Sequence, residues 1–267
     1  MTFFEAIILS VIQSATEFLP VSSSGHLLFM KGIFHLEEIP IIFDVVIHVG
    51  SLTAILIFYY HRILNVVSET VMEWRNRSIK KPQTRFLIYI IISTLVTMGI
   101  YLLFNDTIEA QYETPAVLFY TFLFTSVLLF STLFISPNTG RPVTQKGLLL
   151  PLFTGFFQAL AILPGVSRSG STISTLLHFN IKKQDAAFYS FFLAIPAILG
   201  ALVFKLTDLK NLSYLLDHWP LILVSFILSA VFSYLFLFLL TWILQKGKLW
   251  YFTFYTLTMA VISKILF

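Results

Sequence analysis

Cysteine is absent from the sequence, and charged residues are scarce. Without cysteine the chain can form neither disulfide bonds nor thiolate metal sites. Only 11% of the 267 residues are charged, whereas 57% are hydrophobic and the mean hydropathy is +0.87. A soluble domain of this length needs far more charge to cover its surface. The composition therefore indicates a protein that lies in a lipid bilayer.

Strict alternation of polar and apolar residues, the pattern of transmembrane β-strands, is not dominant either. Apolar residues instead form long runs at Phe86–Phe104, Ala116–Ile135 and Leu221–Leu244. Each run is near the ~20 residues that an α-helix needs to cross a hydrocarbon core of ~30 Å. These runs predict an all-α polytopic membrane protein.

No cleavable signal peptide is evident, because the first apolar segment contains Glu5, Gln13 and Glu17. We therefore expect residues 1–267 to form a single membrane domain. The formal net charge of +4 does not indicate a nucleic-acid partner. The basic residues flank apolar segments, where they act as orientation signals.

The sign of the charge in the connectors predicts which side of the membrane each one occupies. Basic connectors favour the cytoplasmic side. Four connectors are basic, namely residues 61–85, 141–146, 182–183 and 246–248. The acidic connector around Asp106 and Glu109 and residues 205–220 are then external. All these assignments agree only if two segments enter the membrane without crossing it.

Two segments have the composition of such re-entrant hairpins. Phe3–Leu19 carries polar residues and stops at Pro20-Val21-Ser22-Ser23-Ser24-Gly25-His26. Leu148–Leu163 stops at Pro164-Gly165-Val166-Ser167-Arg168-Ser169-Gly170-Ser171-Thr172. Broken helices with polar tips are tolerated at membrane depth only where protein buries them or where they line a wet cavity.

The two tips also resemble each other, since Gln13 and Leu19-Pro20 line up with Gln158 and Leu163-Pro164. Each hairpin is followed by about three predicted spans, so we predict two repeats, residues 1–136 and 147–267. An odd number of crossings inverts the second repeat. This is the plan of secondary transporters, in which the site lies where the broken helices meet.

Polar residues of the first tip are the first candidates for chemistry. Glu17 and Gln13 lie four residues apart and share a helix face. A carboxylate at membrane depth usually has a function, although a buried polar pair is the structural alternative. We expect Glu17 to bind a metal ion, to orient His26, or both.

The residues after Pro20 should begin the returning helix. Serines there can cap the helix, and its free N–H groups suit phosphate. His26 alone could be a satisfied buried histidine. Beside Ser22, Ser23 and Glu17 it predicts a nucleophile with a neighbouring base and a carboxylate that orients the imidazole. Asp44 and His48, four residues apart on a later helix, could line the same cavity.

Arg168 is the main candidate of the second tip, flanked by Ser167 and Ser169 with Thr172 nearby. It could pair with Glu17 across the two tips, a structural role. We favour the alternative that its guanidinium grips phosphate oxygens, helped by serine hydroxyls and backbone N–H groups.

These two tips resemble a known family. The stretch from Gln13 through Glu17-Phe18-Leu19-Pro20-Val21-Ser22-Ser23-Ser24-Gly25-His26 is similar to the first motif of the undecaprenyl-diphosphate phosphatases linked to bacitracin resistance. Pro164–Thr172 is similar to the second motif, and the length and hydropathy match along essentially the whole chain.

The resemblance implies hydrolysis of undecaprenyl diphosphate to the lipid monophosphate that carries cell-wall precursors. On matching positions it implies that Glu17, Ser23, His26 and Arg168 are essential. The nucleophile stays open between Ser23, with His26 as base, and His26 itself or water. The side chains or backbone expected to contact phosphate are those of Ser22, Ser24, Gly25, Ser167, Arg168, Ser169 and Thr172.

The family is associated with Mg²⁺ or Ca²⁺, hard ions that prefer oxygen ligands. Glu17 and Gln13 are the candidate ligands here. The family has Glu or Gln at the position of Gln13. The expected location is the bacterial cytoplasmic membrane, with the site open to the outside. The sequence leaves the oligomeric state open, a homodimer included. The rival function is a polyprenyl-phosphate transporter or flippase that uses the same inverted-repeat site.

Overall fold

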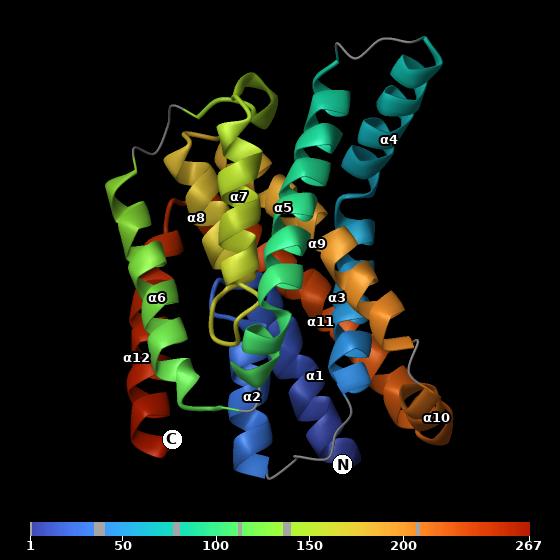
Figure 1. The fold of residues 1–267 in the computed structure, drawn as a ribbon, viewed down its shortest axis with the longest axis vertical. Coiled ribbons are helices and arrows are strands. Elements are labelled where there is room, and N and C mark those ends of the chain that lie inside the picture. Colours follow the sequence, from blue (N-terminus) through green and yellow to red (C-terminus); the bar gives the residue numbers. More distant parts are fainter. Residues whose placement is uncertain (1, 35–40, 77–80, 112–113, 136–139, 207–208) are drawn as a thin grey trace.

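A computed structural model describes residues 2–34, 41–76, 81–111, 114–135, 140–206 and 209–267 (Figure 1). Within these ranges every regular element is a helix, and strand-like pairing is limited to an isolated bridge between Arg141 and Ile181. The prediction of an all-α protein is confirmed.

Among the described residues, five helices are long and apolar enough to cross a membrane. They are α5 (Pro82–Gln111), α6 (Val117–Ser131), α9 (Lys183–Leu206), α11 (Trp219–Gln245) and α12 (Phe252–Leu266). The helices α3 (Ile41–Phe58) and α4 (Tyr60–Arg75) are also apolar enough when taken together, and they are bent by 76° at their junction, as in a broken span or a re-entrant loop. The three long apolar runs fall on α5, on α6 with η1 (Thr132–Phe134), and on α11. The chain is a multi-pass membrane protein.

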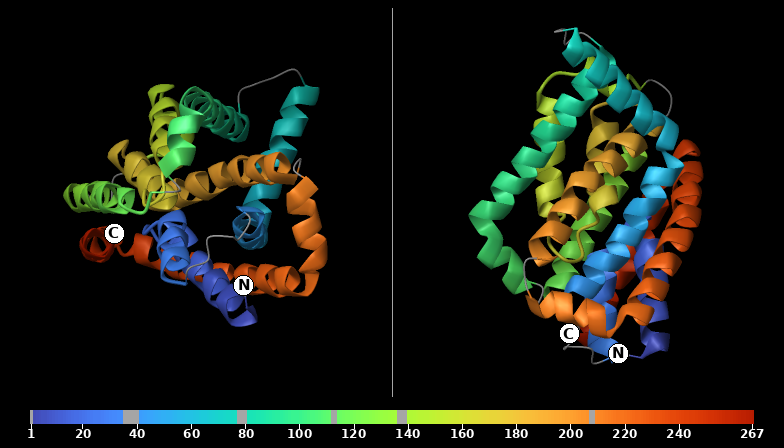
Figure 2. Two further views of the ribbon diagram at one scale, coloured as in Figure 1. Left: turned by 60° about the horizontal axis from the view of Figure 1, so that its bottom comes forward. Right: turned by 90° about the vertical axis from the view of Figure 1, so that its right-hand side faces the viewer.

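Two pairs of shorter helices form the predicted re-entrant hairpins. The first pair is α1 (Phe3–Phe18) and α2 (Ser23–Phe34), and the second is α7 (Leu149–Leu160) and α8 (Arg168–His178). Pro20 follows the C-cap residue Leu19 of α1, and proline disfavours the helical conformation in the residue before it. The helix α7 ends at Leu160, and short turns lead from there to Pro164. The first hairpin enters from the end that holds both chain termini, and the second enters from the opposite end (Figures 1 and 2). The hairpins are therefore inverted relative to each other.

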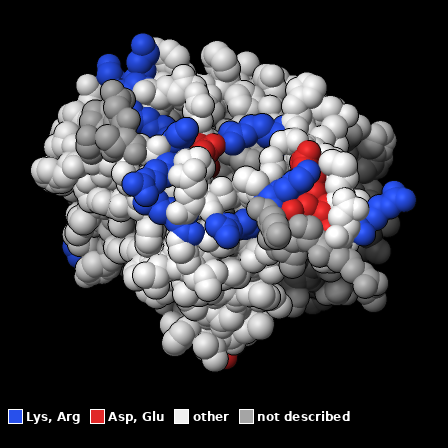
Figure 3. Space-filling view, turned by 90° about the horizontal axis from the view of Figure 1, so that it is seen from above, with Lys and Arg blue, Asp and Glu red and all other residues white. Residues whose placement is uncertain are grey.

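Charge is distributed unevenly between the two ends of the molecule. The helices α4, α6, α8 and α11 all end at one end of the molecule, where lysine and arginine side chains gather (Figures 1 and 3). The first turn of α1 and the end of α5 at the other end carry Glu5 and Glu109. The positive-inside rule predicts that the basic end faces the cytoplasm. Between the ends, many large apolar side chains are exposed, as expected for a surface that faces lipid.

Close packing of small residues holds α3 against α11. Ser225, Ser229 and Ser233 recur every four residues on α11 and are buried. A Cβ atom on Gly50 of α3 would lie 2.7 Å from the carbonyl oxygen of Phe226. Small residues allow helix backbones to approach closely in a membrane, where the hydrophobic effect does not drive association. The short helix α10 (Leu209–Asp217) and the turns η2 (Val143–Gln145) and η3 (Leu249–Tyr251) complete the fold.

Candidate active site between the hairpin tips

The two hairpin tips meet glycine against glycine. A Cβ atom on Gly25 would lie 2.7 Å from the Cα of Gly165, closer than real Cβ contacts come. Gly165 also has φ +94°, and a Cβ there would overlap the hydroxyl of Thr121. Both positions therefore need glycine, and the contact fixes how near the two tips come to each other.

Serine caps both returning helices. The hydroxyl of Ser22, whose φ is +71°, accepts hydrogen bonds from the N–H groups of Gly25 (3.2 Å) and Gly165 (3.1 Å). The hydroxyl of Ser167 accepts from the N–H of Gly170 at 3.0 Å. Ser22 thus caps α2 and ties it to the second tip. Ser22 and Ser167 therefore have the helix-capping role that was one of the alternatives for the serines of the tips.

Glu17 is the centre of the site. Its side chain is buried near the end of α1, with 6% of the residue exposed. One carboxylate oxygen accepts a hydrogen bond from the hydroxyl of Ser23 at 2.6 Å and lies 3.2 Å from Nε2 of His48. The other oxygen accepts from Nη2 of Arg168 at 2.7 Å. A buried carboxylate requires such partners, since a lone buried charge is very costly.

Arg168 therefore joins the two tips. This is the structural role considered in the sequence analysis, a pair with Glu17 across the tips. Its second terminal nitrogen, Nη1, donates to the carbonyl oxygen of Ser190 on α9 at 3.1 Å. A guanidinium has more N–H donors than these two. Pairing with Glu17 is thus compatible with the phosphate contact that we favoured, which stays a prediction.

His26 lies apart from the pair formed by Glu17 and Ser23. Its Nδ1 is 2.7 Å from the carbonyl oxygen of Ser22, and its Nε2 is 2.7 Å from the hydroxyl of Tyr255 on α12. The imidazole stacks on the ring of Tyr255. The expected hydrogen bonds from Glu17 and Ser23 to His26 are not those observed, because both ring nitrogens have other partners. Glu17, not His26, is the acceptor for the Ser23 hydroxyl.

For His48 the sequence predicted only that it could line the cavity together with Asp44. It lies on α3, and its Nδ1 is 2.6 Å from the carbonyl oxygen of Asp44, while Nε2 faces Glu17. Both neighbours are acceptors, and only a ring protonated on both nitrogens donates to both. Glu17 lies between the imidazole of His48 and the guanidinium of Arg168. The i, i+4 spacing of Asp44 and His48 was the available signal, but it does not reveal the partner on another helix.

The other predicted phosphate contacts lie beside these groups, where several hydroxyls fix the tips. Ser169 donates to the carbonyl oxygen of Leu19 at 3.4 Å, which links α8 to the first tip. Thr172 donates to the carbonyl oxygen of Arg168 (2.8 Å) and bonds the hydroxyl of Ser190 (2.6 Å). Ser24 lies 3.4 Å from the Ser22 hydroxyl. In this arrangement the hydroxyls of Ser169 and Thr172 are engaged in packing the tips.

Gln13 does not turn toward Glu17. Its carbonyl oxygen accepts from the hydroxyls of Ser51 (3.2 Å) and Ser229 (3.0 Å), and its amide donates back to Ser51. Across the described ranges no group of three histidine or acidic side chains is placed to hold a metal ion. Gln13 and Glu17 thus do not fit a divalent-ion site in this arrangement, and the cation stays a prediction.

The arrangement combines the requirements of a group transfer to or from phosphate. A half-buried hydroxyl is bonded to a carboxylate that can take its proton. An arginine and the first turns of α2 and α8 supply N–H donors and positive potential next to that hydroxyl. These groups come from different hairpins, so the site exists only where the tips meet.

Comparison with known proteins agrees with this description. Residues 6–262 match the family model of the bacitracin resistance protein BacA. An undecaprenyl-diphosphatase of Carboxydothermus hydrogenoformans is 37% identical over 100% of this chain and 98% of its own length. The undecaprenyl-diphosphatase of Treponema denticola is 35% identical over 100% and 98% of the two chains. Undecaprenyl-diphosphatase 2 of Halalkalibacterium halodurans is 33% identical over 98% and 95%. The chain belongs to the bacitracin resistance protein BacA family.

Proposed function

We propose that the protein is an integral membrane phosphatase that hydrolyses undecaprenyl diphosphate to undecaprenyl phosphate and inorganic phosphate. The observation that carries this proposal is the cluster of Ser23, Glu17 and Arg168 at the meeting point of the two tips. Membership of a family whose relatives are named undecaprenyl-diphosphatases supports the substrate.

In the proposed reaction the diphosphate lies against the first turns of α2 and α8. Arg168 and backbone N–H groups contact its oxygens and stabilise the charge that develops on the transferred phosphoryl group. The oxygen of Ser23 attacks the terminal phosphorus as its proton passes to Glu17. The bond from that phosphorus to the bridging oxygen breaks, and undecaprenyl phosphate leaves with the bridging oxygen.

Water then attacks the phosphoserine. One hydrogen of the water stays on the released phosphate, the other returns to Ser23, and Glu17 gives its proton to solvent. Glu17 is preferred to His26 as the acceptor because the Ser23 hydroxyl already donates to it, while both nitrogens of His26 have other partners. A labelled phosphoprotein with phosphate on Ser23 supports this route, and label on His26 contradicts it.

The biological setting belongs to the same proposal. Release of undecaprenyl phosphate in the bacterial cytoplasmic membrane recycles the lipid carrier of cell-wall synthesis. Removal of the diphosphate lowers the amount of lipid available to bacitracin and so confers resistance. The first hairpin, which carries Glu17 and Ser23, enters from the end opposite the basic connectors, which supports a site that opens outside.

The test is phosphate release from undecaprenyl diphosphate by the detergent-purified full chain, with and without Mg²⁺ or Ca²⁺. We expect Ser23→Ala, Glu17→Gln and Arg168→Ala to lower turnover strongly. Ser10→Ala is the matched control, because that buried hydroxyl bonds only the carbonyl oxygen of Ala6 in its own helix. If the wild-type protein binds the lipid without releasing phosphate under any condition, the phosphatase proposal fails and the transporter takes its place.

A further inference from the structure

A polar cavity lies at the cytoplasmic end of the molecule, away from the hairpin tips. It lies between the end of α8, the start of α9, the end of α11 and η3, and its volume is about 460 Å³. Cavities that bind small ligands typically have ~300–1,000 Å³. We call it the basic pocket, and the side chains that define it are Lys182, Lys183, Lys246 and Trp250.

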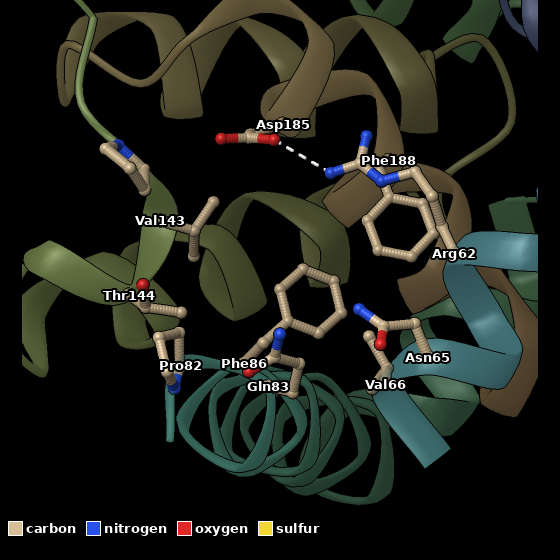
Figure 4. Close-up of a pocket in the computed structure, with 11 residues that line it drawn as sticks. Arg62, Asn65, Val66, Pro82, Gln83, Phe86, Val143, Thr144, Asp185 and Phe188 are labelled. Atoms are coloured by element: carbon tan, nitrogen blue, oxygen red, sulfur yellow. Dashed lines mark hydrogen bonds and ion pairs between the residues drawn. The ribbon is translucent and has the colours of Figure 1, made fainter. Parts of the chain in front are cut away.

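The charge of the basic pocket is not balanced by its lining. Among the described residues that line it, three are lysines and none is acidic. A neighbouring cavity of about 160 Å³ differs in this respect (Figure 4), because Arg62 there forms an ion pair with Asp185 at 2.8 Å. Uncompensated positive charge in a concave site attracts anions. The basic pocket therefore favours an anionic ligand, whereas the neighbouring cavity already holds its own counter-ion.

The lysines also indicate where the ligand comes from. Nζ of Lys183 donates to the carbonyl oxygen of Gln245 at 3.4 Å, which places it at the turn after α11. Nζ of Lys246 lies 5.9 Å from the ring centroid of Trp242, whose side chain is exposed on α11. Tryptophan is enriched where a membrane protein passes through the lipid headgroups. The basic pocket thus adjoins the membrane surface at headgroup level.

Part of the remaining lining is apolar. Leu177, Leu244 and Leu249 are buried and line the pocket, together with polar residues such as Gln184 and Gln245. A site lined by both lysines and apolar side chains suits a ligand that carries both an anionic group and hydrocarbon. Basic pockets between helices on the cytoplasmic side are known to take phosphate-bearing headgroups.

We propose that the basic pocket binds the phosphate-bearing headgroup of an anionic phospholipid from the cytoplasmic leaflet. The phosphate contacts Lys182, Lys183 and Lys246, and the glycerol and first acyl carbons lie on the leucine wall. This binding site is separate from the site at the hairpin tips and does not depend on the function proposed for that site.

Fluorescence of Trp250 tests the proposal in the full chain. Replacing Trp74, Trp219 and Trp242 with Phe leaves Trp250 as the only tryptophan. The protein is placed in nanodiscs of phosphatidylcholine with a small share of brominated phosphatidylglycerol, and in parallel with the same share of brominated phosphatidylcholine. We expect stronger quenching by the anionic lipid, with an apparent affinity that falls about fivefold for each lysine changed to Gln.

Two further variants separate a built site from general surface charge. Lys182→Arg/Lys183→Arg/Lys246→Arg should keep the preference, which shows that substitution at these positions is tolerated. The triple change Arg75→Gln/Lys81→Gln/Lys146→Gln removes the same charge from the same end outside the pocket, and should also keep it. The proposal is overturned if brominated phosphatidylcholine quenches equally, or if Lys182→Gln/Lys183→Gln/Lys246→Gln does not lose more of the preference than the Gln triple outside the pocket. Displacement of the lipid by millimolar inorganic phosphate would assign the pocket to a free anion and overturn the lipid assignment.

Discussion

Replacement of Gly25 by alanine should separate the two tips and reduce turnover strongly. The added Cβ would lie 2.7 Å from the Cα and 2.8 Å from the N of Gly165, both backbone atoms that cannot rotate away. Carbon atoms in contact stay ~3.5–4.0 Å apart, so one tip must shift by about 1 Å. A misplacement of ~1 Å can cost about a hundredfold in rate. We expect kcat/KM for phosphate release to fall about a hundredfold, because Ser23 on one tip then no longer faces Arg168 on the other.

The matched control is Gly200→Ala on α9. Nothing lies within 4 Å of a Cβ added there, and alanine is the better helix former by ~1 kcal/mol. Its activity should equal that of the wild type, and its melting temperature should not fall. Overpacking at Gly25 should cost about 1–3 kcal/mol of stability, so kcat/KM is compared below both melting temperatures. A folded Gly25→Ala protein with wild-type kcat/KM would refute the claim that this contact sets the geometry of the site.

Three further substitutions probe the groups around Glu17. Glu17→Gln should lower kcat by about 10²–10⁴ without loss of folding, since the amide cannot take the proton of Ser23; phosphate release checks this, and an active Gln variant would contradict it. His48→Leu should lower the unfolding free energy by about 2 kcal/mol through the lost bond to the carboxylate, seen as a lower melting temperature, and His48→Gln should recover part of it. Tyr255→Phe removes a single neutral hydrogen bond to His26, worth ~1 kcal/mol, and should change kcat by no more than about fivefold. A loss of kcat much larger than fivefold in Tyr255→Phe would contradict this expectation.

The sequence predicted the fold well because the bilayer restricts what a chain can do. Length and hydropathy identify helices that cross, and the sign of the connectors orients them. Pro20 and Pro164, each followed by serine and glycine, then predicted where the helices of each hairpin are interrupted. Both interruptions are present, between α1 and α2 and between α7 and α8. These are local signals, and a local signal is enough to place a helix end.

The site was predicted less completely because it depends on contacts between distant helices. The two hairpins allowed a pair between Glu17 and Arg168, but this was the alternative to the phosphate contact that we favoured for Arg168. The turn of His26 toward Tyr255 on the last helix was not predicted, and neither was the approach of His48 on α3 to Glu17. Which polar side chains pair across helices depends on rotations of a few tens of degrees, and no periodicity in a single sequence specifies them. The partners of Gln13 could not be predicted for the same reason, since these serines lie on α3 and α11.

The meeting of the two tips has a consequence for synthesis of the protein. Glu17 and Arg168 are 151 positions apart in the chain. Glu17 is therefore synthesised before Arg168, and His48 is the nearer of its two partners in the sequence. A ribosome-bound or truncated chain that lacks the second hairpin has no complete site.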